Sequence, residues 1–151
     1  MGEVLFYHLT RSPAEAVLEL LLPRALAQGW RVAVRGADRK RLEWLDERLW
    51  LGPEEQFLPH GLAGGPHDAR QPVLLTTAAE AANAPQALAV IDGAAVRPDE
   101  ADTLERIWVL FDGADAAAVQ AARELYKAFR TAGFPPQYWS EAGGRWQRQD
   151  G

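Results

Sequence analysis

Apolar residues along the chain gather in short runs, separated by longer segments in which they recur every three or four positions. The runs lie at residues 4–9, 30–34, 72–77, 87–92 and 106–112, and their length and composition are typical of buried strands. The longer segments have the spacing of helices that bury one side. Because strands and helices alternate from the start of the chain, the pattern predicts an α/β fold with a mostly parallel sheet and crossover helices.

The first two predicted helices have recognisable ends. Ser12 precedes Pro13, and a polar cap followed by proline at the first helical position is a typical helix start. This helix should run to about residue 28 and stop at Gly29, while Pro23 inside it should kink or split it. The second helix should follow Asp38 as its cap and continue to residue 49.

Residues 50–66 form a long connection rich in proline and glycine, which interrupt regular structure. Its large apolar residues are Trp50, Phe57, Leu58 and Leu62. Long loops with such residues tend to cover a core or to contact a partner, and the pattern leaves both open. Residues 78–84 have room for one or two helical turns and residues 98–105 for another. The segment after residue 134 is either an edge hairpin or a loose tail.

Residues 115–134 predict a third helix with two distinct sides. Asp112 or Asp115 can cap its start, and Gly133 can end it. The apolar side consists of Val119, Ala122, Tyr126 and Phe129. The neighbouring cationic side consists of Arg123, Lys127 and Arg130. Tyr126 falls on the border between the two sides, so an aromatic ring lies beside three cations. Such a surface suits an acidic peptide with an apolar end, although cations near a helix C-terminus also simply complement its dipole.

Composition narrows the class of protein. The 151 residues suit one domain, residues 1–151, and 48% of them are hydrophobic, which is enough for a sizeable core. The formal net charge of −5 argues against strong direct binding to nucleic acid or to a membrane surface, because that needs clustered positive charge. The lack of cysteine removes disulfides and thiolate chemistry and fits a reducing cytoplasm. We see no signal-peptide pattern and no apolar run of membrane-spanning length.

The motifs of an enzyme on such a sheet are missing. The turn at residues 10–13 has no glycine, and neither glycine-rich phosphate-binding motif occurs. The three histidines lack metal-ligand spacing, and no serine, histidine and aspartate grouping suggests a nucleophile. Asp92 and Asp112 end predicted strands, where aspartate is more often a turn or cap residue than a ligand. We therefore expect no catalytic residue, no metal and no cofactor.

Five stretches of the chain carry a resemblance to a known family, at residues 6–9, 49–50, 57–64, 72–73 and 124–134. Taken together and in this order, the five stretches resemble the chi subunit of bacterial DNA polymerase III. The last stretch is the one most specific to that family. The resemblance covers nearly the whole chain. It implies a Rossmann-like, three-layer α/β fold without a nucleotide-binding loop, and a non-catalytic accessory role in the clamp-loader assembly during DNA replication.

The resemblance also implies partners and site residues. This family links the clamp loader, through its psi subunit, to single-stranded DNA-binding protein, whose acidic C-terminal tail ends in Pro-Phe. In some bacteria the family also partners a repair helicase. The family's tail-binding helix matches Arg123, Tyr126, Lys127 and Arg130, with Val119 where some relatives hold another cation. The surface for psi or the helicase matches Trp50, Phe57 and Leu58. The implied location is the cytoplasm, at the nucleoid through the replisome.

Two other classes of function stay open from the residues alone. A small enzyme acting on nucleotides or phosphates would have a carboxylate-lined cleft near Asp92 and Asp112, at the ends of strands, where ligands gather on such sheets. A direct nucleic-acid binder would show a basic stripe interleaved with stacking aromatic rings.

Overall fold

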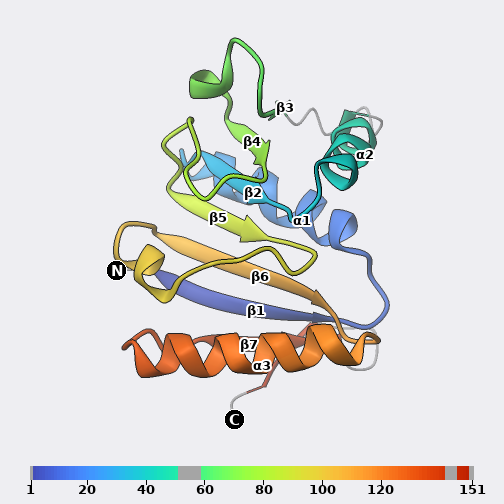
Figure 1. Ribbon diagram of the computed structural model, residues 1–151, viewed down its shortest axis with the longest axis vertical. Coiled ribbons are helices and arrows are strands. Elements are labelled where there is room, and N and C mark those ends of the chain that lie inside the picture. Colours follow the sequence, from blue (N-terminus) through green and yellow to red (C-terminus); the bar gives the residue numbers. More distant parts are fainter. Residues whose placement is uncertain (1, 51–58, 142–145, 150–151) are drawn as a thin grey trace.

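The computed structural model describes residues 2–50, 59–141 and 146–149, and the strands in this part of the chain form one sheet (Figure 1). The strands are β1 (Glu3–Leu9), β2 (Val32–Arg35), β3 (Gly61–Leu62), β4 (Val73–Thr76), β5 (Ala87–Val90), β6 (Arg106–Asp112), β7 (Gln137–Ser140) and β8 (Gln147–Gln149). Their order across the sheet is β3-β4-β2-β5-β6-β1-β7-β8. Neighbouring strands are parallel except β7 and β8, which pair antiparallel. The predicted α/β fold with a mostly parallel sheet is confirmed.

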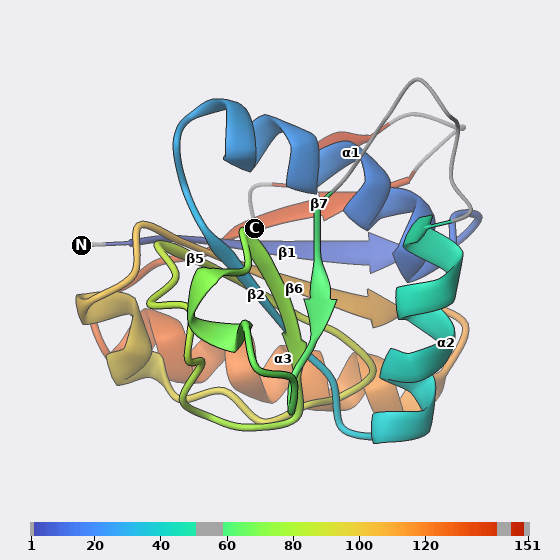
Figure 2. The same cartoon turned by 90° about the horizontal axis from the view of Figure 1, so that it is seen from above.

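Helices cover both faces of the sheet, which gives three layers (Figure 2). The helices α1 (Ala14–Ala27) and α2 (Arg39–Trp50) pack on one face, and α3 (Ala116–Thr131) packs on the other. Two 3-10 helices, η1 (Asp68–Arg70) and η2 (Pro98–Asp102), lie in the connections. Within the described residues, no helix combines the length and the apolar character needed to cross a bilayer.

Successive side chains of β1 point to opposite faces of the sheet, so this strand contributes to a separate hydrophobic core on each face. Leu5 and Leu9 belong to the core under α1 and α2, whereas Val4 and Phe6 belong to the core under α3. Phe129 of α3 is fully buried in that second core. Burial of each such side chain stabilises the fold by about 1.5–3 kcal/mol, so α3 is held firmly against β1 and its neighbours.

Both ends of α3 are closed by hydrogen bonds. The Asp115 carboxylate accepts the amides two and three residues on, at 3.0 and 3.4 Å, so Asp115 rather than Asp112 is the cap. Gly133 has a φ of 94°, and the Phe134 amide bonds to the Phe129 carbonyl at 2.9 Å. This is a Schellman ending, in which glycine takes the left-handed conformation that other residues avoid. The predicted extent of this helix is confirmed.

The start of α1 differs from the prediction. Pro13 stands at the cap position without a side-chain cap, and the Ser12 hydroxyl instead donates to the Glu141 carboxylate at 2.6 Å. The local sequence favours a cap at Ser12, but a partner from the far end of the chain takes its hydroxyl. Pro23 lies inside one continuous α1, so the predicted split does not occur.

Residues 78–84, which have room for one or two helical turns, form no helix. Side-chain hydrogen bonds connect this segment to neighbouring strands and loops instead. Asn83 is fully buried and donates to the Val32 and Gln71 carbonyls at 3.1 and 3.0 Å, while Arg35 donates to the Ala79 carbonyl at 2.7 Å. The turn predicted within residues 98–105 is present as η2. Of the two alternatives for the segment after residue 134, the structure forms the edge hairpin, as β7 and β8.

Candidate protein-interaction site

The cationic side of α3 lies in solvent. Arg123, Lys127 and Arg130 are all exposed, and none of them forms an ion pair or a side-chain hydrogen bond with the residues that the structure describes. Their spacing of four and three positions places them on one flank of the helix. Cations held close together without anionic partners repel one another, and an acidic ligand would relieve that repulsion.

Tyr126 forms the apolar border of this flank. Its half-buried ring packs against Phe6 and Tyr138, with centroid distances of 5.5 and 6.2 Å, and its hydroxyl donates to the Pro136 carbonyl at 3.2 Å. Val119 is half-buried and packs against the same core. The ring is thus fixed at both ends, so one apolar edge beside the cations is rigid and needs little ordering on binding.

Strand β7 contributes residues that the sequence did not single out for this site. The Tyr138 hydroxyl and His8 Nδ1 are 2.6 Å apart. Burial raises the pKa of Tyr138, and the positive charge of Arg123 acts in the opposite direction. The signal available in the sequence was the aromatic pair Tyr138 and Trp139, which favours a strand, but nothing local indicated which strand this segment joins. Its pairing with β1, at Phe6 and Tyr138, brings the ring to the face that α3 covers.

Glu141 fastens the end of β7 to the loop between β1 and α1. Its Oε1 accepts the amides of Thr10, Arg11 and Ser12 at 3.1, 3.2 and 3.0 Å, and its Oε2 accepts the Ser12 hydroxyl. Only 8% of Glu141 is exposed. Although burial raises the pKa of this carboxyl, the four hydrogen bonds outweigh burial and hold the pKa below its usual value.

The surface predicted for a second partner is described only in part. Trp50 ends α2 with half of its surface exposed, and its ring lies 4.2 Å from the His60 ring. His60 is buried, and its Nε2 lies 3.1 Å from the carbonyl of Asp46 and 3.2 Å from that residue's carboxylate. Phe57 and Leu58 lie outside the described residues. Trp50 is therefore not a core residue, and the interface assignment stays a prediction.

The two aspartates at the strand ends are engaged in different contacts, Asp112 in a turn and Asp92 in an ion pair with a distant residue. Asp112 accepts the Ala114 amide at 2.9 Å, and Asp92 accepts the Nε of Arg41 at 2.8 Å. Among the described residues, no three acidic or histidine side chains are placed to hold a metal ion. The amides of residues 10–12, where related folds bind phosphate, are already occupied by the Glu141 carboxylate.

Comparison with known proteins identifies the family. The family model described as DNA polymerase III chi subunit, HolC, matches residues 1–137. This chain belongs to the DNA polymerase III chi subunit family. DNA polymerase III subunit chi of Escherichia coli K12 is 30% identical over 125 residues, which cover 79% of this chain and 82% of the relative. DNA polymerase III subunit chi of Pseudomonas aeruginosa is 31% identical over 140 residues, which cover 91% of this chain and 95% of the relative. The resemblance seen in the sequence is thereby confirmed.

Proposed function

We propose that this chi-family protein is a non-catalytic accessory subunit of DNA polymerase III, and that it binds the acidic C-terminal tail of single-stranded DNA-binding protein. The observation that carries the proposal is the exposed flank of α3, where Arg123, Lys127 and Arg130 lie without anionic partners among the described residues, beside the fixed ring of Tyr126. Family membership supports the same role, since the relatives are named as subunits of that polymerase.

Each part of the tail finds a complementary group on this flank. The terminal aromatic ring needs an apolar wall, which Val119 and Tyr126 offer with Tyr138 behind them. The terminal carboxylate needs a fixed donor, and the planar fork of Arg123 suits it. The aspartates of the tail lie along the more mobile charges of Lys127 and Arg130.

Most of the affinity should come from the buried ring and the terminal carboxylate. Exposed charge pairs contribute only about 0.2–1 kcal/mol each, so the remaining cations mainly guide the encounter. With Val119 where some relatives hold a further cation, this protein has one charge contact fewer. Binding should therefore weaken with salt without disappearing.

The second partner of this module is the psi subunit of the clamp loader or a repair helicase, bound at the surface of Trp50, Phe57 and Leu58. The half-exposed Trp50 supports this assignment, because aromatic residues are favoured in the centres of interfaces. In this role the protein works in the cytoplasm, at the nucleoid through the replisome.

Calorimetry with a tail peptide tests the proposal. Lys127→Glu and Arg123→Glu should each weaken binding at least fivefold, because each replaces an attractive charge with a repulsive one, and removal of the terminal Phe should weaken it more. Lys40→Glu on α2 is the matched control, since it reverses an exposed charge outside the flank. If both α3 variants bind the peptide as well as the parent does, the tail binds elsewhere.

A further inference from the structure

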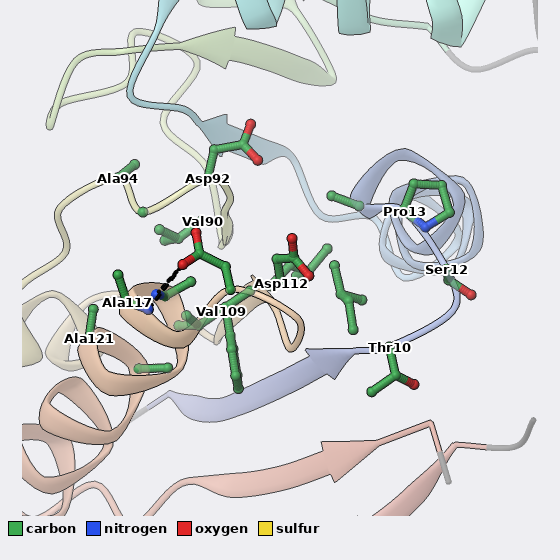
Figure 3. Close-up of a pocket in the computed structure, with 18 of the residues that line it drawn as sticks. Thr10, Ser12, Pro13, Val90, Asp92, Ala94, Val109, Asp112, Ala117 and Ala121 are labelled. Atoms are coloured by element: carbon green, nitrogen blue, oxygen red, sulfur yellow. Dashed lines mark hydrogen bonds between the residues drawn. The ribbon is translucent and has the colours of Figure 1, made fainter. Parts of the chain in front are cut away.

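A cleft lies at the carboxyl ends of β1, β5 and β6. It has a volume of about 880 Å³ and lies between the start of α1 and the first half of α3. Figure 3 shows Ala117 and Ala121 of α3 on one side of it, Asp112 at the end of β6, and Asp92 on the loop that follows β5. Its size is within the range of about 300–1,000 Å³ that is usual for ligand sites.

This cleft is separate from the proposed tail site. Residues in a helix advance by about 100°, so Ala121 and Arg123 lie about 160° apart around α3. Ala121 lines the cleft, whereas Arg123 and Lys127 do not. A ligand in the cleft and a peptide on the cationic flank would therefore contact opposite sides of one helix.

Small side chains create the hollow. Ala117, Ala118 and Ala121 line it over an apolar floor that includes Val109 and Phe111. Ala121 is exposed, so its methyl group faces the open cleft rather than the core. An apolar side chain placed there would bury surface that the protein now leaves in water, which is favourable at about 25 cal/mol per Å².

The rim of the cleft is acidic. Its charged residues are Glu15, Asp92, Asp112 and Asp115 against Arg11 and Arg41, so four carboxylates face two guanidinium groups and the formal charge is −2. Arg41 is already paired with Asp92 at 2.8 Å and with Glu15 at 3.2 Å. Asp112 has no ion pair with any described residue.

The backbone amides that bind phosphate in related folds are not available in this protein. The amides of residues 10–12 would be the donors for an anion at this edge, and Glu141 occupies them. A nucleotide would therefore meet a filled anion site and an acidic rim. The electrostatics favour a cation over an anion in this cleft.

We propose that the cleft binds a short segment of a partner protein that carries lysine or arginine next to apolar residues. An apolar side chain lies against Ala117 and Ala121, and a basic side chain reaches Asp112. The carboxylates stand on separate elements, namely α1, the loop after β5, the end of β6 and the start of α3, so an extended peptide with several side chains meets more of them than a compact cation does.

NMR titration of the full chain with the tetrapeptide acetyl-Leu-Arg-Leu-Lys-amide tests this proposal. We expect saturable shifts at Ala117, Ala118 and Ala121, and no such shifts with acetyl-Leu-Glu-Leu-Glu-amide. Asp112→Asn keeps the oxygen that accepts the Ala114 amide and removes only the charge, so it should weaken binding about two- to fivefold. Ala121→Leu fills the cleft and should weaken binding at least tenfold.

Ala128→Leu is the matched control, because Ala128 is an exposed alanine of the same helix that does not line the cleft. It should leave binding unchanged, as should Lys127→Glu, which separates this site from the tail site. Absence of shifts at millimolar peptide, equal binding of the acidic peptide, or full binding to both Ala121→Leu and Asp112→Asn would each overturn the proposal. If Ala121→Leu does not fold, Asp112→Asn decides the outcome.

Discussion

Removal of the Glu141 carboxylate should loosen the end of β7. In Glu141→Ala, three amides and one hydroxyl lose their shared acceptor. Hydrogen bonds to a charged group contribute about 1.5–3 kcal/mol each, but they are not additive, and in the variant water can replace the carboxylate at the amides of the exposed residues Thr10 and Arg11. We therefore expect a loss of about 3 kcal/mol in the free energy of unfolding. For a chain of this length that lowers Tm by roughly 6–12 °C.

The contribution of Glu141 should also depend on pH with a definite sign. Its pKa is lowered in the folded state, so its stabilisation is complete above the pKa of about 4.3 of an unfolded glutamate and is lost as pH falls through the lower folded pKa. Thermal unfolding followed by circular dichroism at pH 7, and at steps down to pH 3, measures both effects. Glu141→Gln keeps one acceptor and should fall between parent and Ala variant.

Glu47→Ala serves as the control, because Glu47 is an exposed glutamate on α2. It should change Tm by no more than about 2 °C, as surface substitutions usually do. The reasoning is refuted if Glu141→Ala melts within that margin of the parent, or if the difference between the two stays constant from pH 7 to pH 3. In either case the carboxylate would not be the group that fastens β7.

Three further outcomes are expected. Gly113→Ala should cost about 1–3 kcal/mol in a urea unfolding experiment, because the added methyl group collides with the His8 ring and with the Leu9 carbonyl oxygen; a stability equal to the parent's would refute the clash. Phe57→Ala should keep its Tm and lose the clamp-loader or helicase partner in a pull-down, whereas a large fall in Tm would make Phe57 a core residue. The purified chain should not extend a primer, and extension that disappears in Asp92→Ala or Asp112→Ala would overturn its non-catalytic role.

The sequence predicted the elements whose signals are local. The apolar runs placed most of the sheet, and the spacing along α3 separated the exposed cations from buried Phe129 before any contact was known. Capping is also local when the partner is near: Asp115, one of the two predicted caps, starts the helix, and Gly133 ends it as predicted. These features depend on residues within one or two turns of each other, which a linear pattern records.

Contacts between segments far apart in the sequence could not be predicted from such local patterns. The Ser12 hydroxyl bonds to Glu141, 129 residues away, and that long-range contact replaced the predicted cap. Residues 78–84 have room for helical turns, but hydrogen bonds made by the Asn83 and Arg35 side chains hold them against the sheet in an irregular conformation. Tyr138 lies at the candidate site because β7 pairs with β1, and no local feature of residues 137–140 predicts which strand they pair with.

The position of β1 has a consequence for the synthesis of the chain. β1 lies between β6 and β7, so the first strand to leave the ribosome pairs only with strands that begin at Arg106 and Gln137. About 130 residues separate the end of β1 from the end of β7, and at roughly 5–20 residues per second that strand waits on the order of 10 s for its neighbours. Until then its apolar side chains and both of its hydrogen-bonding edges are open to other chains, which makes the growing polypeptide a natural client for chaperones.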